Sequence, residues 1–188
     1  PRTFSSAASD VYKRQTNCTY FFHSEQITVI LSTYQSRSTM PKTLTTNELT
    51  VLGRVDILCD ALEKDYENDN IRLHESSLRD EMHYSPYHEE ALAAIEDGTA
   101  NLNKFKSYEG RKYHKIVMQE YDDMGQYATH QYKDSSVHAF IDKKTGDVYK
   151  PAGYNKPAKH VRFNLLDDNS YEECIHQASW AGGYLYMR

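Results

Sequence analysis

Residues 136–165 constrain the fold of this chain more than any other stretch, because turn residues, strand alternation and clustered charge coincide there. Apolar and polar residues alternate from Val137 to Asp142, which is typical of a strand with one buried face. Residues 143–146 then have the length and the final glycine of a hairpin loop built on a type I turn. The stretch predicts a β-hairpin at about 136–150 and a further strand at 160–165.

The region before this hairpin has a helical pattern. Thr45 and Glu48 have the spacing of a capping box, and a stripe of apolar residues at helical spacing follows from Val51 to Leu62. A later helix begins at Pro86 and is stopped by Gly98. We expect three helices, at residues 46–66, 71–82 and 86–97.

The C-terminal half adds the remaining expected elements. Apolar side chains occur on both faces of residues 111–121, as in a central strand. A short helix is expected after Ser170, which has capping-box spacing to Glu173, and a closing strand at Tyr184–Tyr186. The pattern predicts an α+β fold, with N-terminal helices packed on a small antiparallel sheet of three to five strands. Residues 40–188 would form this single domain.

Residues 1–39 have a different character, without helical or strand periodicity and without the layout of a signal peptide. The stretch Asp10–Gln15, DVYKRQ, reads like the translated end of a transposon adapter used in shotgun sequencing. Arg37-Ser38, just before Met40, can be encoded by a ribosome-binding sequence. We therefore expect a non-native or disordered extension from metagenomic assembly, and a biological start at Met40. The alternative is a genuine extension with a strand at Ile27–Leu31.

The composition excludes several classes of protein. The three cysteines, Cys18, Cys59 and Cys174, lack CxxC spacing, which argues against a disulfide framework or a zinc site and favours a reducing compartment. The nine histidines show no metal-ligand spacing, so we expect no metal and no cofactor. No apolar run approaches the roughly 20 residues of a membrane span. Tyrosine is abundant, with 16 Tyr against 6 Phe, and it suits half-buried sheets and wet interfaces.

Three segments carry a resemblance to a known group of proteins. They are SVHAFIDKKTGDVYKPA, PAKHVRFNLLD and the C-terminal GGYLY. Together they resemble a family of small uncharacterised proteins encoded by tailed bacteriophages, over about residues 40–188. The resemblance implies a phage origin and expression in the cytoplasm of a bacterial host. It supplies no catalytic residue.

Charge is distributed unevenly along the chain. Between Lys143 and Phe163 the only acidic residue is Asp147, and tyrosines lie among the lysines. Residues 41–100 instead hold fourteen Asp and Glu against five Lys and Arg. The net charge of -5 is unusual for a nucleic-acid-binding domain, but a molecule with a local basic surface remains compatible with such binding.

The basic segment gives the preferred functional prediction. Cations and aromatic rings on paired strands can contact phosphates and stack bases. We therefore predict a non-enzymatic phage accessory protein that contacts nucleic acid through the hairpin. The candidate residues are Lys143, Lys144, Tyr149, Lys150, Tyr154, Lys156, Lys159 and Arg162. The plainer interpretation is a solvated sheet edge whose charges discourage aggregation.

Two alternatives remain open. The first is a protein-interaction module for a host or phage protein, with the acidic helices or the tyrosine-rich sheet as its contact surface. The second is a metal-dependent nuclease using Glu120, Asp142, Asp147 and Lys150 at one end of the sheet. Against it, Asp147 and Lys150 have one residue too many between them for the acid-x-Lys step common in nucleases.

Overall fold

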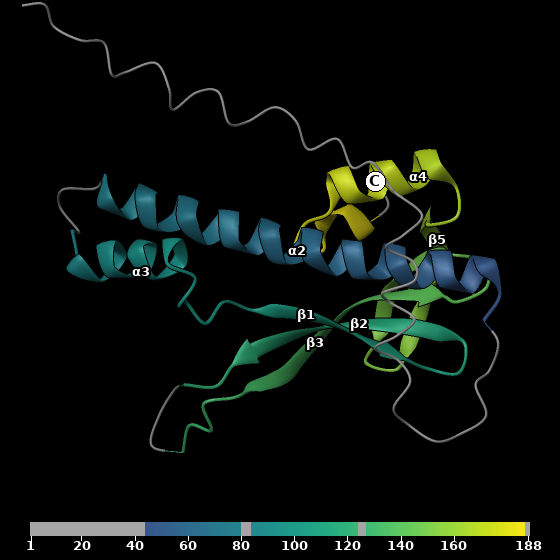
Figure 1. Cartoon of the computed structure of the whole chain (residues 1–188), viewed down its shortest axis with the longest axis horizontal. Helices are drawn as coiled ribbons and strands as arrows, with labels where there is room; N and C mark the ends of the chain where they lie inside the picture. The colour runs from purple at the N-terminus through teal and green to yellow at the C-terminus, as the bar shows by residue number, and fades with distance from the viewer. Residues whose placement is uncertain (1–43, 80–83, 124–126, 187–188) are drawn as a thin grey trace, which may run out of the picture. The chain divides into compact units, whose positions relative to one another are not determined.

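The computed structural model describes residues 44–79, 84–123 and 127–186, so the predictions for residues 1–39 lie outside the described residues. The elements are α2 (Thr46–Leu78), α3 (Pro86–Glu96), β1 (Lys104–Glu109), β2 (Tyr113–Tyr121), β3 (Tyr132–Asp142), β4 (Asp147–Gly153), β5 (Lys156–Asn164), α4 (Asp168–Gln177) and the 3-10 helix η1 (Gly183–Leu185). All five strands form one antiparallel sheet in chain order (Figure 1). The predicted α+β class is confirmed.

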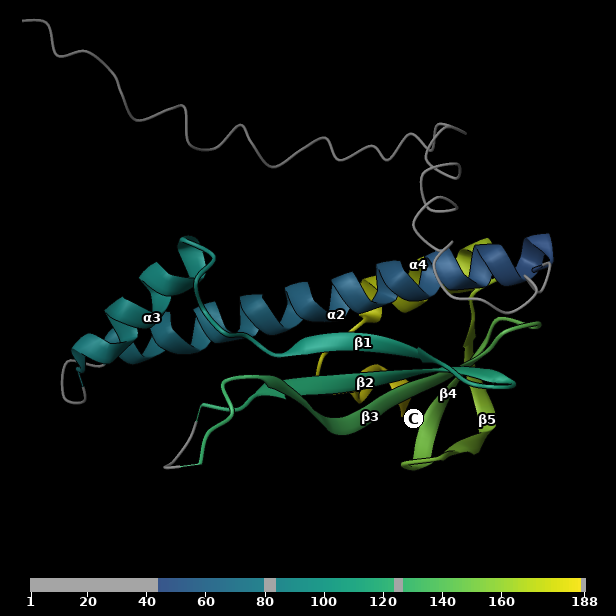
Figure 2. The same cartoon turned by 60° about the horizontal axis from the view of Figure 1, so that its bottom comes forward.

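The hydrophobic core lies between one face of the sheet and α2 (Figure 2). Every strand contributes buried side chains to it: Phe105, Ile116, Ala139, Ile141, Val148 and Phe163. The cysteines Cys59 and Cys174 are free and buried in the same core. Burial raises the pKa of each of these thiols to about 12, which keeps them protonated and unreactive.

The N-terminal half of α2 follows the sequence pattern. The Thr45 side chain accepts a hydrogen bond from the Glu48 backbone N–H, and the Glu48 carboxylate accepts one from the Thr45 N–H, which completes the predicted capping box. Val51, Val55 and Leu62 on the predicted stripe are fully buried. No helix among the described residues has both the length and the apolar composition needed to cross a membrane.

The two helices predicted at 46–66 and 71–82 are one continuous helix as far as Leu78, and that prediction of a break was wrong. The polar stretch at 65–70 contains neither glycine nor proline, so its turn propensity was only a weak preference. Tertiary contacts hold it helical. Asp65 accepts a hydrogen bond from the Trp180 backbone N–H at 3.0 Å, and Asp69 accepts one from the Trp180 indole at 3.0 Å.

Three further differences concern the sheet and the C-terminal segment. Strand β1 was not predicted, although its backbone is tied to α2 by a hydrogen bond from the Phe105 N–H to the Glu63 carboxylate at 2.7 Å. The predicted closing strand at Tyr184–Tyr186 is the 3-10 helix η1 and a residue beyond it. Ser170 does not cap α4, because its hydroxyl accepts from the Asn164 N–H and Asp167 is the N-cap.

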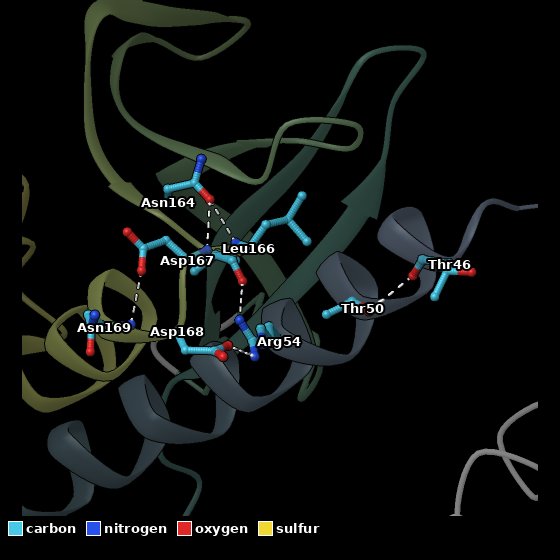
Figure 3. A network of polar contacts seen from close by, with 9 residues as sticks. Thr46, Thr50, Arg54, Asn164, Leu166, Asp167, Asp168 and Asn169 are labelled. Atoms are coloured by element: carbon cyan, nitrogen blue, oxygen red, sulfur yellow. Dashed lines mark hydrogen bonds and ion pairs between the residues drawn. The ribbon is translucent and has the colours of Figure 1, made fainter.

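A polar network joins α2 to the connection between β5 and α4 (Figure 3). Arg54 donates to the Leu165 carbonyl at 2.6 Å and pairs with Asp168. The Asn164 side chain accepts from the backbone N–H groups of Leu166 and Asp167. These bonds satisfy backbone groups that follow the last residue of β5 and tie the connection to α2.

Candidate nucleic-acid interface

The predicted hairpin is confirmed as the β3–β4 connection. Gly146 has a left-handed φ of +72°, and its N–H donates to the Asp142 carbonyl at 2.9 Å. The Asp142 carboxylate accepts from the Lys144 N–H at 2.9 Å, which stabilises the turn. Pairing beyond the turn is short, because β3 and β4 pair only at Phe140 with Tyr149 and at Ile141 with Val148.

Three of the eight predicted contact residues are engaged by the protein itself. The side chain of Lys143 is only 6% exposed and its ammonium pairs with Glu109, so it does not face solvent as the hairpin prediction required. Arg162 donates to the Leu185 carbonyl at 2.6 Å and holds the C-terminal segment. The ammonium of Lys150 lies 3.4 Å from the centre of the Tyr186 ring.

The other five are placed differently. Tyr149 is half-buried, and its hydroxyl reaches the Asp147 carboxylate at 3.4 Å. The remaining four, Lys144, Tyr154, Lys156 and Lys159, are exposed. The eight residues therefore do not form one continuous cationic surface.

A second set of lysines and tyrosines lies on the face of the sheet opposite the core. Because Phe105 and Ile116 point into the core, their strand neighbours point to the other side. The register pairs Tyr108 of β1 with Lys115 of β2. We call this surface the open face and define it by Lys104, Lys106, Tyr108, Tyr113, Lys115, Tyr149 and Tyr154, of which Lys104, Lys106 and Tyr154 are exposed and the others half-buried.

Cations and rings alternate on the open face. The ammonium of Lys115 lies 4.1 Å from the ring centre of Tyr154 and 6.0 Å from that of Tyr108. Lys106 lies 5.2 Å from the ring centre of Tyr108. Among the described residues, none of the ion pairs involves Lys106 or Lys115. Both cations thus lie near tyrosine rings, and the charge of Asp134 acts on them without a direct ion pair.

One carboxylate borders this surface. Asp134 accepts hydrogen bonds from Gln119 at 2.7 Å and from Tyr108 at 2.8 Å, and these bonds lower its pKa below the ordinary value. The hydrogen bond from the Tyr108 hydroxyl to Asp134 also raises the pKa of Tyr108, so this hydroxyl stays protonated. Asp134 orients the Tyr108 ring.

The open face was missed at the sequence level because β1 was not predicted. Lys104-Phe105-Lys106-Ser107-Tyr108 does alternate, with cationic or aromatic residues at every second position around a buried Phe105. This alternation could have indicated a strand with one cationic face. The position of Tyr154 beside Lys115 could not be read from the chain, because it depends on the path of β4.

The carboxylates of the nuclease alternative are engaged separately. Asp142 lies in the turn and pairs with Lys112 at 3.4 Å, and Asp147 accepts from the Thr145 hydroxyl at 2.7 Å. Glu120 accepts from the Ser135 hydroxyl at 2.7 Å. Within residues 44–79, 84–123 and 127–186 no three His, Cys, Asp or Glu side chains could hold a metal ion. The geometry therefore does not favour this alternative.

Two histidines meet where α3 lies against α2. The Nδ1 atoms of His74 and His88 are 2.9 Å apart, and the ring centres are 5.2 Å apart, so the two nitrogens lie between the rings and face each other. Such a contact holds one shared proton as an N–H···N hydrogen bond. His74 is 8% exposed, and its burial, together with the charge of His88, lowers its pKa.

We expect α3 to loosen from α2 in acid, because a second proton would place two N–H groups against each other. The pKa of His74 is lowered in the folded state. The stability that the neutral His74 contributes is therefore complete above pH 6.5, the ordinary pKa of histidine, and is lost as the pH falls below that value. Hydrogen-exchange protection of the α3 amides should then drop by up to about tenfold per pH unit for one proton. A His74→Gln/His88→Gln variant should lose this extra dependence, and an unchanged profile in that variant would contradict the assignment.

Comparison with known proteins gives a family and no activity. No curated protein and no solved structure matches the chain. One family model matches residues 32–187, which includes every described residue, the open face and the hairpin. The chain therefore belongs to the family described as "Family of unknown function (DUF7717)".

Proposed function

We propose that this protein binds single-stranded nucleic acid on the open face of its sheet. The observation that carries the proposal is the Lys115 cation at 4.1 Å from the ring centre of Tyr154 and 6.0 Å from that of Tyr108. Aromatic rings on an open sheet can stack with unpaired bases, and neighbouring lysines can contact the phosphates between those bases. Single strands fit better than duplexes because their bases are accessible for stacking.

Exposed lysines outside the open face add candidate phosphate contacts. Lys156 lies two residues beyond Tyr154, at the start of β5, and is exposed. Lys144 and Lys159 are also exposed and could add phosphate contacts, whereas Lys143 is left out because it is buried against Glu109. The acidic charge of the chain is concentrated in the helices, so it does not oppose a strand on the other side of the sheet.

The test is fluorescence polarisation with a labelled single-stranded oligonucleotide at low and at moderate salt. A Tyr108→Leu/Tyr154→Leu variant should bind at least tenfold more weakly, since each stacked base is worth about 1–3 kcal/mol. A Lys106→Gln/Lys115→Gln variant should also reduce the dependence of log K on log salt by about 1.4, at about 0.7 per phosphate.

A matched variant, Lys144→Gln/Lys159→Gln, removes the same charge from the β3–β4 turn and from β5, and it separates these lysines from the open face. A larger loss in this variant than in Lys106→Gln/Lys115→Gln would move the contact to the β3–β4 turn and β5. No binding by the unmodified chain at low salt would reject nucleic-acid binding altogether, because phosphate contacts are strongest there.

Protein binding is the second candidate function, and one observation favours it. Leu73 on α2 and Tyr84 and Tyr87 beside or on α3 are 60%, 52% and 63% exposed, so this helical pair presents large side chains to solvent that a protein partner could cover.

We further infer, from the resemblance of residues 136–165 to proteins of tailed bacteriophages, that the protein is a phage accessory factor made in the cytoplasm of a bacterial host. The absence of disulfide spacing among its cysteines is in keeping with a reducing compartment.

A further inference from the structure

A cavity opens where β3 and β4 separate. The two strands pair at only two positions and then diverge, and the C-terminal segment closes the gap from the core side. The cavity has a volume of about 240 Å³, and a neighbouring hollow of about 400 Å³ shares Ser136, Val137 and Pro151 with it. The residues that determine its chemistry are His138, Lys150, Trp180, Gly182, Leu185 and Tyr186.

His138 supplies a hydrogen-bond donor to this cavity. Its side chain is 8% exposed, and burial lowers its pKa to about 4, so the ring is neutral and carries one N–H. Its Nε2 lies 3.1 Å from the Tyr184 hydroxyl. Burial raises the pKa of Tyr184 well above its ordinary value, so this hydroxyl keeps its proton.

The proton positions follow from hydrogen-bond satisfaction. Among the described residues, the Tyr184 hydroxyl has His138 as its hydrogen-bond partner, so it donates to Nε2 rather than leaving a buried O–H without an acceptor. The ring N–H of His138 is then on Nδ1. No hydrogen bond to Nδ1 is formed by the described residues, and Gly182 leaves space beside it, since a Cβ there would lie 3.9 Å away. This N–H therefore has no hydrogen-bond partner among the described residues and is available to a ligand in the cavity.

Lys150 supplies a cation at the same cavity. Its ammonium lies over the Tyr186 ring at 3.4 Å, and no ion pair with a carboxylate of the described residues is formed. None of the lining residues is acidic. Apart from Ser136, the remaining lining side chains are apolar or aromatic, including Met118, Trp180 and Leu185. Two donors, one of them charged, thus face a cavity with a mixed polar and apolar lining, and a few polar groups among apolar ones are what orient a small molecule in its site.

We propose that this cavity binds a small organic anion carried on a flat ring. The anionic group accepts from the Lys150 ammonium and the His138 Nδ1–H, and the ring packs against the apolar and aromatic walls. A nucleoside monophosphate and an aromatic carboxylate share this chemistry. The aromatic carboxylate fits within the cavity of about 240 Å³, whereas the nucleoside monophosphate also occupies the neighbouring hollow. Neither Lys150 nor His138 belongs to the open face, so variants at these two residues test the cavity apart from strand binding, whereas the neighbouring hollow shares Tyr154 with the open face.

The only tryptophan of the chain, Trp180, lines the cavity and reports on its occupation. Its fluorescence, excited at the red edge to avoid nucleotide absorption, is followed while the full chain is titrated with adenosine monophosphate, 4-hydroxybenzoate or inorganic phosphate in separate experiments. Calorimetry provides an independent measure of each affinity. We expect a saturable change with at least one of the two ring-bearing anions, and binding of inorganic phosphate at least tenfold weaker.

Two variants locate the binding. Lys150→Met keeps the apolar stem and removes the charge, and this variant should bind the ligand at least tenfold more weakly. Lys159→Met is the control: it removes an exposed charge from the same β4–β5 hairpin and should leave the affinity unchanged. His138→Phe should also weaken it at least tenfold, with thermal unfolding measured to show that each variant is folded. The proposal is overturned by the lack of a saturable signal with either ring-bearing anion, by equal losses in the two lysine variants, or by phosphate binding as tightly as the ringed ligands.

Discussion

Replacing Gly146 by alanine should destabilise the protein by about 2–5 kcal/mol, of which the left-handed backbone accounts for about 1–2 and overpacking for about 1–3. Gly146 has φ +72°, and a Cβ would lie 2.9 Å from Leu166 Cγ and 3.0 Å from the Leu166 backbone nitrogen. The Leu166 N–H is held by Asn164 at 2.8 Å, and the Gly146 carbonyl accepts from the Leu165 N–H at 2.7 Å. Neither side of the contact can move away without breaking a hydrogen bond.

Gly98 is the matched control for this substitution. It has nearly the same left-handed φ, +69°, but a Cβ there would meet nothing within 4 Å. Gly98→Ala should therefore lose only the backbone contribution of about 1–2 kcal/mol. Urea unfolding of both variants gives the two free energies of unfolding, and their difference isolates the steric contact with Leu166. Equal losses would mean that the β3–β4 turn relaxes freely and does not depend on its packing against the end of β5.

The features predicted from sequence alone are those whose causes lie within a few residues. The capping box needs only Thr45 and Glu48, and the turn needs only Gly146 at the end of a short polar loop. The buried stripe of α2 follows from a spacing of three and four residues. In each case the local preference and the tertiary structure agree, so the pattern was sufficient.

The features that were missed depend on partners far along the chain. The break expected inside α2 is absent because Asp65 and Asp69 accept hydrogen bonds from Trp180, more than a hundred positions later. Strand β1 is anchored by Glu63 as well as by its pairing with β2. No local pattern contains this information, and propensity is too weak to outweigh such contacts.

The candidate interface illustrates the same limit. Charge clustering along the sequence placed Lys143 among the contact residues, but its neighbour Glu109 comes from another strand and turns the lysine inward. Conversely, Lys115 and Tyr154 are distant in sequence and become adjacent only through the path of β4. A sequence can show that cations and rings are present on strands, whereas the sheet register decides which of them share a face.

Leu58→Ala should destabilise the protein by about 2–5 kcal/mol, because it removes a fully buried side chain from the contact between α2 and the sheet. Leu73→Ala is the matched control on the same helix, where the side chain is 60% exposed, and it should change stability by no more than about 0.5 kcal/mol. Both variants make the same exchange within α2, so helix propensity cancels and the difference measures burial. Unfolding in urea, with circular dichroism as the signal, gives both values. Similar losses at the two positions would show that the C-terminal half of α2, where Leu73 lies, is packed as firmly as the half that covers the sheet.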